Sequence, residues 1–117
     1  MSRASVEIVP RFRLYRGEEI ALGPGKADLL EAIASTGSIV AAAAELGMSY
    51  ARAWRLVRTM NACFKSPLVE KERGGNDRGG ASLTERGRAV LAAYRAMERR
   101  AAAATARDAA ALRRHMA

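Results

Sequence analysis

Three arginines recur at every third residue in the middle of the chain, at Arg52, Arg55 and Arg58. In a helix this spacing places their side chains on neighbouring turns and close to one another. Each guanidinium carries a permanent positive charge and a planar fork of N–H donors, which matches phosphate oxygens and the O6 and N7 edge of guanine. The spacing therefore indicates binding of an anion rather than catalysis.

Residues that perform catalysis or bind metals are scarce. The chain has one histidine, His115, and one cysteine, Cys63, and no pair of carboxylates stands out by its spacing. A single thiol forms no internal disulfide, and no base or second metal ligand lies near it in the sequence. We therefore expect no enzyme, no metal site and no cofactor.

The chain is strongly basic, with 20 Lys and Arg against 12 Asp and Glu and a formal net charge of +8. Basic residues outnumber acidic ones by seven to three in 47–80 and by eight to three in 81–117, whereas 1–46 has five against six. The excess begins beside the three arginines, which favours nucleic acid as the partner; a solvated basic surface is the alternative. No apolar run approaches the roughly 20 residues that span a bilayer, so we expect a cytoplasmic protein without a membrane partner.

The segment 39–56 has the residue pattern of a helix-turn-helix unit. Two helices cross at a tight turn only if the crossing residues are small or apolar. Ala43 occupies the fifth position, where a small residue is needed, and Gly47 occupies the ninth, at the turn. The apolar positions are filled by Ala42, Leu46, Met48, Ala53 and Leu56. The pattern predicts two crossing helices, the second of which begins at Ser49.

The helix that begins at Ser49 is expected to have two faces. Apolar residues at intervals of three and four form the face that points inward: Ala53, Leu56, Val57 and Met60. In a docked helix-turn-helix, the N-terminal half of the second helix enters the major groove of double-stranded DNA. We therefore expect Arg52 and Arg55 to reach base edges. Ser49, Tyr50 and Arg58 are expected to contact phosphates.

The flanking residues predict a mainly helical α+β fold in a single winged helix-turn-helix domain over 1–117. Turn residues, capping residues and periodicity give the element order β-β-α-α-α-β-β-α. The expected parts are an N-terminal β-hairpin in 6–22, a three-helix core in 26–64 with the helix-turn-helix in 39–64, a two-stranded wing in 68–83, and one long C-terminal helix in 84–115.

The sequence GGNDRGG lies between the two expected strands of 68–83. It lacks the Gly-Lys-Ser/Thr ending of a phosphate-binding loop, and no helix follows it directly, so we interpret it as the tip of a wing; a floppy loop is the alternative. The residues expected to lie along the DNA backbone or in the minor groove are Lys71, Arg73, Asn76 and Arg78. Trp54 is expected to pack against a neighbouring helix or the wing rather than to contact a base.

The last helix has apolar residues at alternating intervals of four and three: Val90, Tyr94, Met97 and Ala101. This spacing is typical of a seam between two helices and predicts a homodimer through this helix. In the alternative, the helix packs on its own domain through Leu91 and Tyr94 and then frays.

The stretch 26–88 resembles the N-terminal DNA-binding domain of the ModE family, the molybdate-responsive regulators related to LysR-type winged helices. The residues that carry the resemblance are LLEAIASTGSIVAAAAELGMSYARAWRLVRTMN and LVEKERGGNDRGGASLTERG. It implies a dimeric transcriptional regulator that binds an imperfect inverted repeat, with Ser49, Tyr50, Arg52 and Arg55 in the reading helix and 73–78 in the wing. Members of the family carry C-terminal domains for molybdate or tungstate. No such domain is visible up to Ala117, so molybdate binding is not expected.

Two functions follow from these observations. The first is a sequence-specific DNA-binding regulator. The second is a non-catalytic protein-interaction or dimerisation module that acts with a separate sensor partner. Exposed arginines at the centre of the surface favour the first, because protein-docking surfaces carry few charges at their centre.

Overall fold

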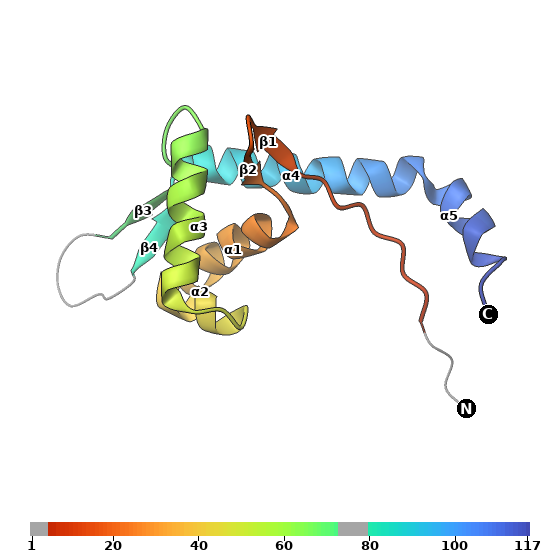
Figure 1. Cartoon of the computed structure of the whole chain (residues 1–117), viewed down its shortest axis with the longest axis horizontal. Helices are drawn as coiled ribbons and strands as arrows, with labels where there is room; N and C mark the ends of the chain where they lie inside the picture. Colours follow the sequence, from red (N-terminus) through yellow and green to blue (C-terminus); the bar gives the residue numbers. More distant parts are fainter. Residues whose placement is uncertain (1–4, 73–79) are drawn as a thin grey trace.

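The computed structural model describes residues 5–72 and 80–117, and within them five helices and two antiparallel hairpins follow one another (Figure 1). The elements are β1 Leu14–Arg16, β2 Glu19–Leu22, α1 Pro24–Thr36, α2 Ile39–Glu45, α3 Tyr50–Cys63, β3 Val69–Lys71, β4 Ala81–Leu83, α4 Glu85–Ala104 and α5 Ala106–Arg113. The predicted mainly helical α+β fold is confirmed.

Hydroxyl side chains start three of these helices where the sequence predicts it. Ser38 accepts a hydrogen bond from the Ala41 N–H at the start of α2, over 3.1 Å. Ser49 and Thr84 cap α3 and α4 in the same way. Each cap satisfies a backbone donor that the first helical turn leaves without a partner. These local hydrogen bonds explain why the helix starts are readable from the sequence.

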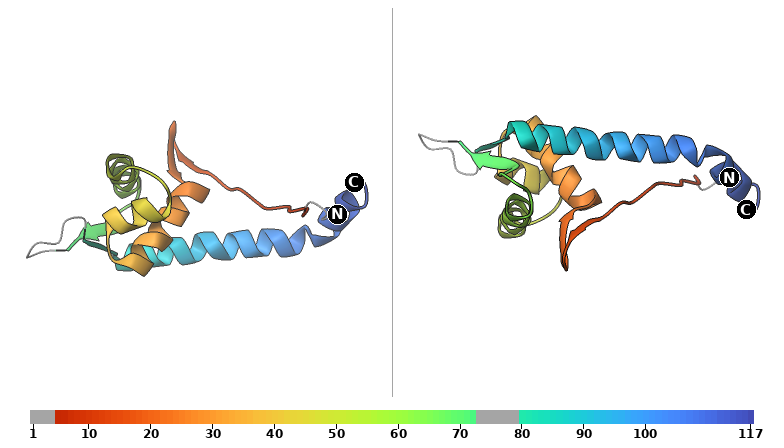
Figure 2. Two further views of the ribbon diagram at one scale, coloured as in Figure 1. Left: turned by 90° about the horizontal axis from the view of Figure 1, so that it is seen from below. Right: turned by 90° about the horizontal axis from the view of Figure 1, so that it is seen from above.

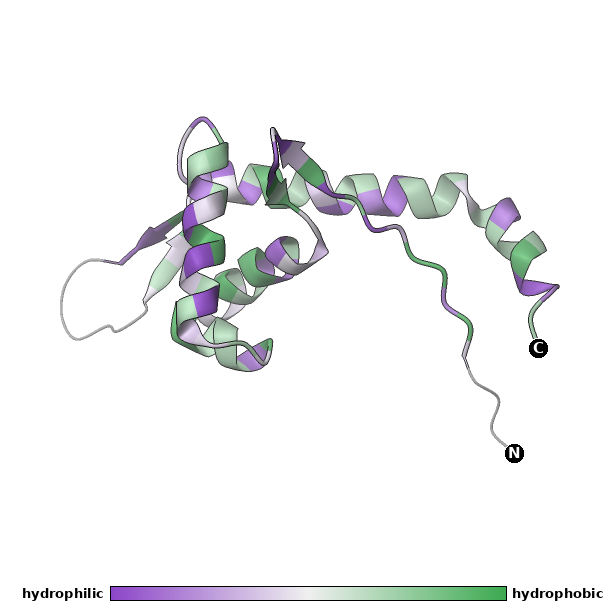
Figure 3. Ribbon diagram, in the orientation of Figure 1, coloured by the Kyte–Doolittle hydropathy of each residue, from purple (hydrophilic) through white to green (hydrophobic). Residues whose placement is uncertain are grey.

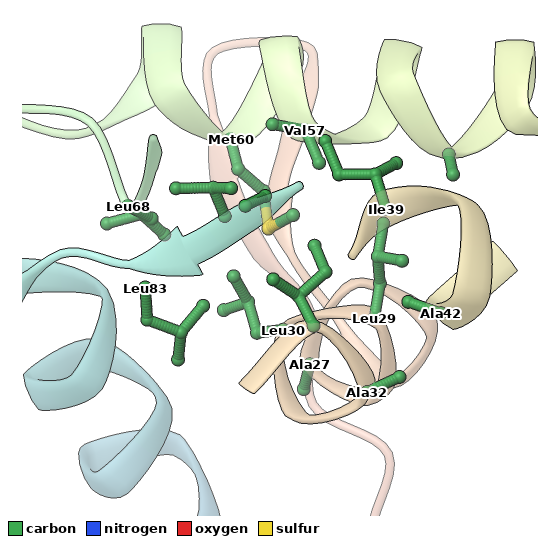
Figure 4. Packing of buried hydrophobic residues seen from close by; sticks show 14 of the residues in the cluster. Ala27, Leu29, Leu30, Ala32, Ile39, Ala42, Val57, Met60, Leu68 and Leu83 are labelled. Atoms are coloured by element: carbon green, nitrogen blue, oxygen red, sulfur yellow. The ribbon is translucent and has the colours of Figure 1, made fainter. Parts of the chain in front are cut away.

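The core forms where α1, α2 and α3 meet the wing strands (Figure 4). Its members are apolar, and the larger ones are fully buried: Leu22, Leu29, Leu30, Ile33, Ile39, Val57, Met60 and Leu68. Alanines such as Ala42 and Ala53, both 0% exposed, allow α2 and α3 to approach closely. Burying each large aliphatic side chain contributes roughly 1.5–3 kcal/mol, so this cluster is the main source of stability.

The N-terminal hairpin is shorter than predicted. Strand β1 begins at Leu14 rather than near residue 6, and it pairs antiparallel with β2 across a turn at Gly17. Because β2 ends at Leu22, no partner strand remains for the residues before Leu14. Pro10 also lacks an N–H group for strand pairing. Residues 5–13 therefore run without strand pairing towards the far end of the molecule (Figure 1).

The C-terminal segment forms two helices instead of the single helix predicted for 84–115. The break falls at Thr105, whose backbone has φ −104° and ψ 11°. Its hydroxyl donates to the Ala101 carbonyl over 2.7 Å, a type of side-chain contact that bends helices. Beyond the break α5 lies beside the N-terminal segment, and Ala109 is 8% exposed. The tail is therefore helical up to Arg113 rather than frayed.

Among the described residues, no helix combines the length and the apolar content needed to cross a membrane.

Candidate nucleic-acid interface

Helix α3 lies at the surface with two distinct faces. Ala53, Val57 and Met60 are 0% exposed and point into the core, and Leu56 is half-buried against it. The three arginines at 52, 55 and 58 are exposed on the other side. Figure 3 shows hydrophilic and hydrophobic residues alternating along α3. The surface thus presents guanidinium groups from successive turns of one helix.

The turn between α2 and α3 is tight because Gly47 adopts a left-handed conformation with φ 69°. The Met48 N–H of the turn then donates to the Ala43 carbonyl of α2 over 2.9 Å, which fixes the turn against the end of α2. Ala43 is 2% exposed at the crossing, as the helix-turn-helix pattern predicts. Leu46 differs from its expected inward position, since it is 37% exposed. It forms the C-cap of α2.

The first turn of α3 has hydrogen-bond donors at the surface. The Ser49 oxygen accepts from the Arg52 N–H over 3.1 Å, which leaves the hydroxyl hydrogen able to donate to a phosphate. Tyr50 follows and is 38% exposed. The N-terminus of a helix also attracts anions through its unpaired N–H groups. This arrangement suits a phosphate beside the start of the helix.

Trp54 joins α3 to the wing. The Lys71 ammonium of β3 lies 4.3 Å from the centre of the indole ring, a cation–π contact. The ring is half-buried against the core, as predicted for a packing residue. Lys71 is exposed, and its charge lies beside α3. The other wing residues expected to contact DNA, at 73, 76 and 78, lie outside the described residues.

Asn61 fixes the wing against α3 and was not singled out in the sequence. Its amide oxygen accepts from the Leu68 N–H over 2.8 Å and from the Val69 N–H over 3.1 Å. Its amide nitrogen donates to the Val69 carbonyl over 3.0 Å. The only signal in the sequence is the Met-Asn pair at the end of α3. These three hydrogen bonds fix the start of β3 against the last turns of α3.

The start of α4 packs on the same turn. The Thr84 hydroxyl donates to the Pro67 carbonyl over 2.6 Å, and the Thr84 N–H donates to the Leu68 carbonyl over 2.9 Å. Gly87 is buried beside this backbone, and a Cβ atom there would lie 2.1 Å from the Leu68 oxygen. Only glycine permits this approach between helix and turn.

Helix α4 is fixed to α1 by an ion cluster that the sequence did not reveal. The Arg95 guanidinium contacts Asp28 at 2.8 Å, Glu31 at 3.1 Å and Glu98 at 3.0 Å. Partial burial lowers the pKa of Arg95, but the hydrogen bonds to these carboxylates outweigh it and raise the pKa. The carboxylates thus lie at the α1–α4 contact, whereas α3 lies on the opposite side of α1 (Figure 2). These three carboxylates therefore do not pair with the arginines of α3.

The residues expected in a dimer seam differ in their surroundings. Tyr94 is 3% exposed within its own chain, and its hydroxyl donates to the Phe12 carbonyl over 2.7 Å. Burial raises the pKa of this hydroxyl. Val90, Met97 and Ala101 are half-buried and retain exposed surface. The first half of α4 therefore packs on its own chain through Tyr94, as in the alternative considered for this helix.

The arrangement defines a class of protein. Three helices, the last two joined by a tight turn, precede a two-stranded wing, which is the winged helix-turn-helix architecture. Residues 26–88 match the model of the bacterial regulatory helix-turn-helix proteins of the LysR family. The chain belongs to this family.

Two curated relatives and one solved structure refine this assignment. The chain is 41% identical over 91 residues to the molybdenum-pterin-binding protein MopA of Rhodobacter capsulatus, a match covering 78% of this chain and 34% of MopA. It is 36% identical over 77 residues to the DNA-binding transcriptional dual regulator ModE of Escherichia coli, covering 66% of this chain and 29% of ModE. The chain thus spans about a third of the length of these relatives, and the resemblance to the ModE DNA-binding domain is confirmed.

The solved structure is the DNA-binding domain of CbnR in complex with DNA. It superposes with a TM-score of 0.60 at 26% identity and covers 75% of this chain and 95% of that one. The winged helix-turn-helix fold predicted from the sequence is therefore confirmed.

Proposed function

We propose that this chain is a transcriptional regulator that acts in the cytoplasm by binding specific double-stranded DNA sequences. The observation that carries the proposal is the outer face of α3. Arg52, Arg55 and Arg58 are exposed there, and none forms an ion pair with a described carboxylate. Three unpaired guanidinium groups on a surface helix repel one another unless an anion lies between them. Duplex DNA supplies such anions as its phosphates, and guanine offers acceptors for arginine at O6 and N7.

In this proposal α3 lies in the major groove with its N-terminal half deepest. Arg52 and Arg55 reach base edges, while Ser49, Tyr50 and Arg58 contact phosphates on either side. Lys71 and the wing residues Arg73, Asn76 and Arg78 follow the backbone or the minor groove. The relative named as a DNA-binding regulator and the neighbour solved with DNA support the proposal that the chain binds DNA.

The arginines of α3 provide the first prediction. Arg55→Ala is expected to reduce discrimination between the best site and a mismatched site by about 1–3 kcal/mol, since a bidentate contact to guanine is lost. Arg58→Ala is expected to weaken binding to all duplexes alike and to lower the salt slope by about 0.9. Fluorescence anisotropy with a selected site and a scrambled duplex, over a series of salt concentrations, measures both effects.

The same titrations separate this proposal from the interaction module. A module that docks on protein has no reason to bind duplex DNA with a steep salt dependence. If the parent protein binds duplexes without a salt slope, or if both variants bind like the parent, α3 is not the reading helix.

We also propose that the regulator binds an inverted repeat as a homodimer through α4 and α5. Helix α4 projects away from the core (Figure 1), and its last residues, 99–104, are exposed except for the half-buried Ala101. An apolar groove lies at this end, and Ile8, Val9 and Leu112 on its sides are 42%, 46% and 60% exposed. A second copy related by a two-fold axis would cover these residues together with the free surface of Val90, Met97 and Ala101.

The dimer provides the second prediction. Ala101→Glu is expected to yield monomers at concentrations where the parent is dimeric, because it places a charge in the apolar seam, where burial of an unpaired carboxylate is costly. Ala103→Glu lies on the other side of the helix and is exposed, so it should leave the dimer intact. Sedimentation velocity measures the association state. A monomeric parent, or a dimeric Ala101→Glu variant, would contradict this seam.

A further inference from the structure

A groove separates the N-terminal hairpin from α3. The hairpin lines it with Arg16 and Glu19, and α3 lines it with Arg55, Arg58 and Thr59. Three guanidinium groups from two elements far apart in the sequence thus border one cleft. No local pattern in the sequence predicts this juxtaposition, because about 40 residues separate Arg16 from the arginines of α3.

The hairpin is held firmly in this position. Strand β2 contacts α3 and ends in Ala21 and Leu22, which are 4% and 1% exposed. The chain just before β1 is fixed as well, because the Phe12 carbonyl accepts the hydrogen bond from Tyr94. Figure 2 shows the hairpin on the same side of α1 as α3. The hairpin therefore has a fixed position beside α3, and a ligand bound to this part of α3 would contact it.

The outer strand of the hairpin has no cover. All three residues of β1 are exposed: Leu14 at 41%, Tyr15 at 62%, and Arg16. A strand with both faces exposed contributes little to the core. Its residues are therefore available for contact with a partner.

The charges of the groove indicate an anionic partner. Neither Arg16 nor the two arginines of α3 form an ion pair within the described chain. Glu19 is the one carboxylate among the lining residues, and it also acts on Lys26 of α1. Burial lowers the pKa of Lys26, while the charge of Glu19 raises it. Three guanidinium groups against one carboxylate leave the groove positive, as a phosphate site requires.

We propose that the β1–β2 hairpin is a second wing, in which Arg16 together with Arg58 holds a backbone phosphate of the DNA strand that borders the groove read by α3. This inference rests on the proposed function. The first wing, β3–β4, lies at the other side of α3, so the two hairpins would contact the duplex on both sides of the reading helix (Figure 1). The hairpin adds affinity and sets the register of α3 without reading bases.

Two substitutions in this groove have opposite expected effects. Arg16→Ala should lower the salt slope by about 0.9 and weaken binding to every duplex about eightfold near roughly 0.1 M salt, because one phosphate contact is lost. Glu19→Gln should tighten binding to every duplex, because it removes a charge that repels the phosphate. Arg99→Ala is the matched control, since Arg99 is exposed on α4 and lies away from this groove. Anisotropy titrations over a salt series measure all three.

The outcomes distinguish this inference from the proposed function. If the parent protein fails to bind duplex DNA, the proposed function fails and this inference fails with it. If the parent and Arg58→Ala behave as expected but Arg16→Ala binds with the affinity and slope of Arg99→Ala, only the second wing is refuted. Ethylation interference gives an independent readout, in which Arg16→Ala should lose one group of phosphates at the edge of the site. Thermal melts of the variants should match that of the parent, because Arg16 and Glu19 are exposed.

Discussion

Gly87→Ala is expected to destabilise the protein by at least about 3 kcal/mol, an effect at the upper end for a single added methyl group. A Cβ atom at this position would lie 2.1 Å from the Leu68 oxygen, 2.9 Å from its carbonyl carbon and 3.2 Å from its Cα atom. All three are backbone atoms, so no flexible side chain can move aside. Urea denaturation followed by circular dichroism measures the loss.

The backbone that Gly87 meets is held from two directions, which is why the clash cannot relax cheaply. The Leu68 N–H donates to Asn61, and the Leu68 carbonyl accepts from the Thr84 N–H. Moving α4 outward would break the second bond and expose the core beneath the turn. Gly25→Ala is the matched control, since Gly25 is exposed within α1 and an added Cβ would meet nothing within 4 Å. This control should be neutral or stabilised by up to about 1 kcal/mol. Equal stability of the two variants would contradict the packing described for α4.

Asn61→Ala is expected to cost about 2–4 kcal/mol of stability, because the Leu68 and Val69 N–H groups and the Val69 carbonyl lose their partner. The loss of stability should be concentrated at the start of β3, around Leu68 and Val69. Hydrogen exchange at the Leu68 and Val69 amides should therefore accelerate more than exchange in α1. The emission of Trp54 should shift to longer wavelength, because its contact with Lys71 depends on the position of β3.

Thr59→Ala serves as the control for this prediction. Its hydroxyl donates only to the Arg55 carbonyl of its own helix, over 3.1 Å, and alanine is the stronger helix former. A change within about 0.5 kcal/mol is expected. If Asn61→Ala melts like Thr59→Ala and the two amides remain protected, the three hydrogen bonds do not hold the wing.

Part of this structure could be read from the residues alone, because the signals act over one turn of chain. Ser38, Ser49 and Thr84 cap the helices that follow them, and Gly47 permits the turn between α2 and α3. The spacing of apolar residues in α3 determines which face is buried, and hence that the three arginines are exposed. These local features are sufficient to predict the winged helix-turn-helix fold and the resemblance to the ModE family.

The tertiary structure decided what depends on contacts between distant segments. Asn61 reaches β3, Gly87 meets Leu68, and Arg95 binds two carboxylates of α1, yet no local pattern marks any of these residues. The burial of Tyr94 likewise depends on Phe12, 82 residues away in the chain.

The arginines of α3 illustrate the same division. Their interval of three residues determined that their side chains lie close together on neighbouring turns of one helix, because helix geometry alone relates neighbouring turns. Only the packing of β2 against α3 brought Arg16 to the same groove as Arg55 and Arg58. Helical periodicity carries no information about which distant hairpin lies beside that face, since core packing determines it.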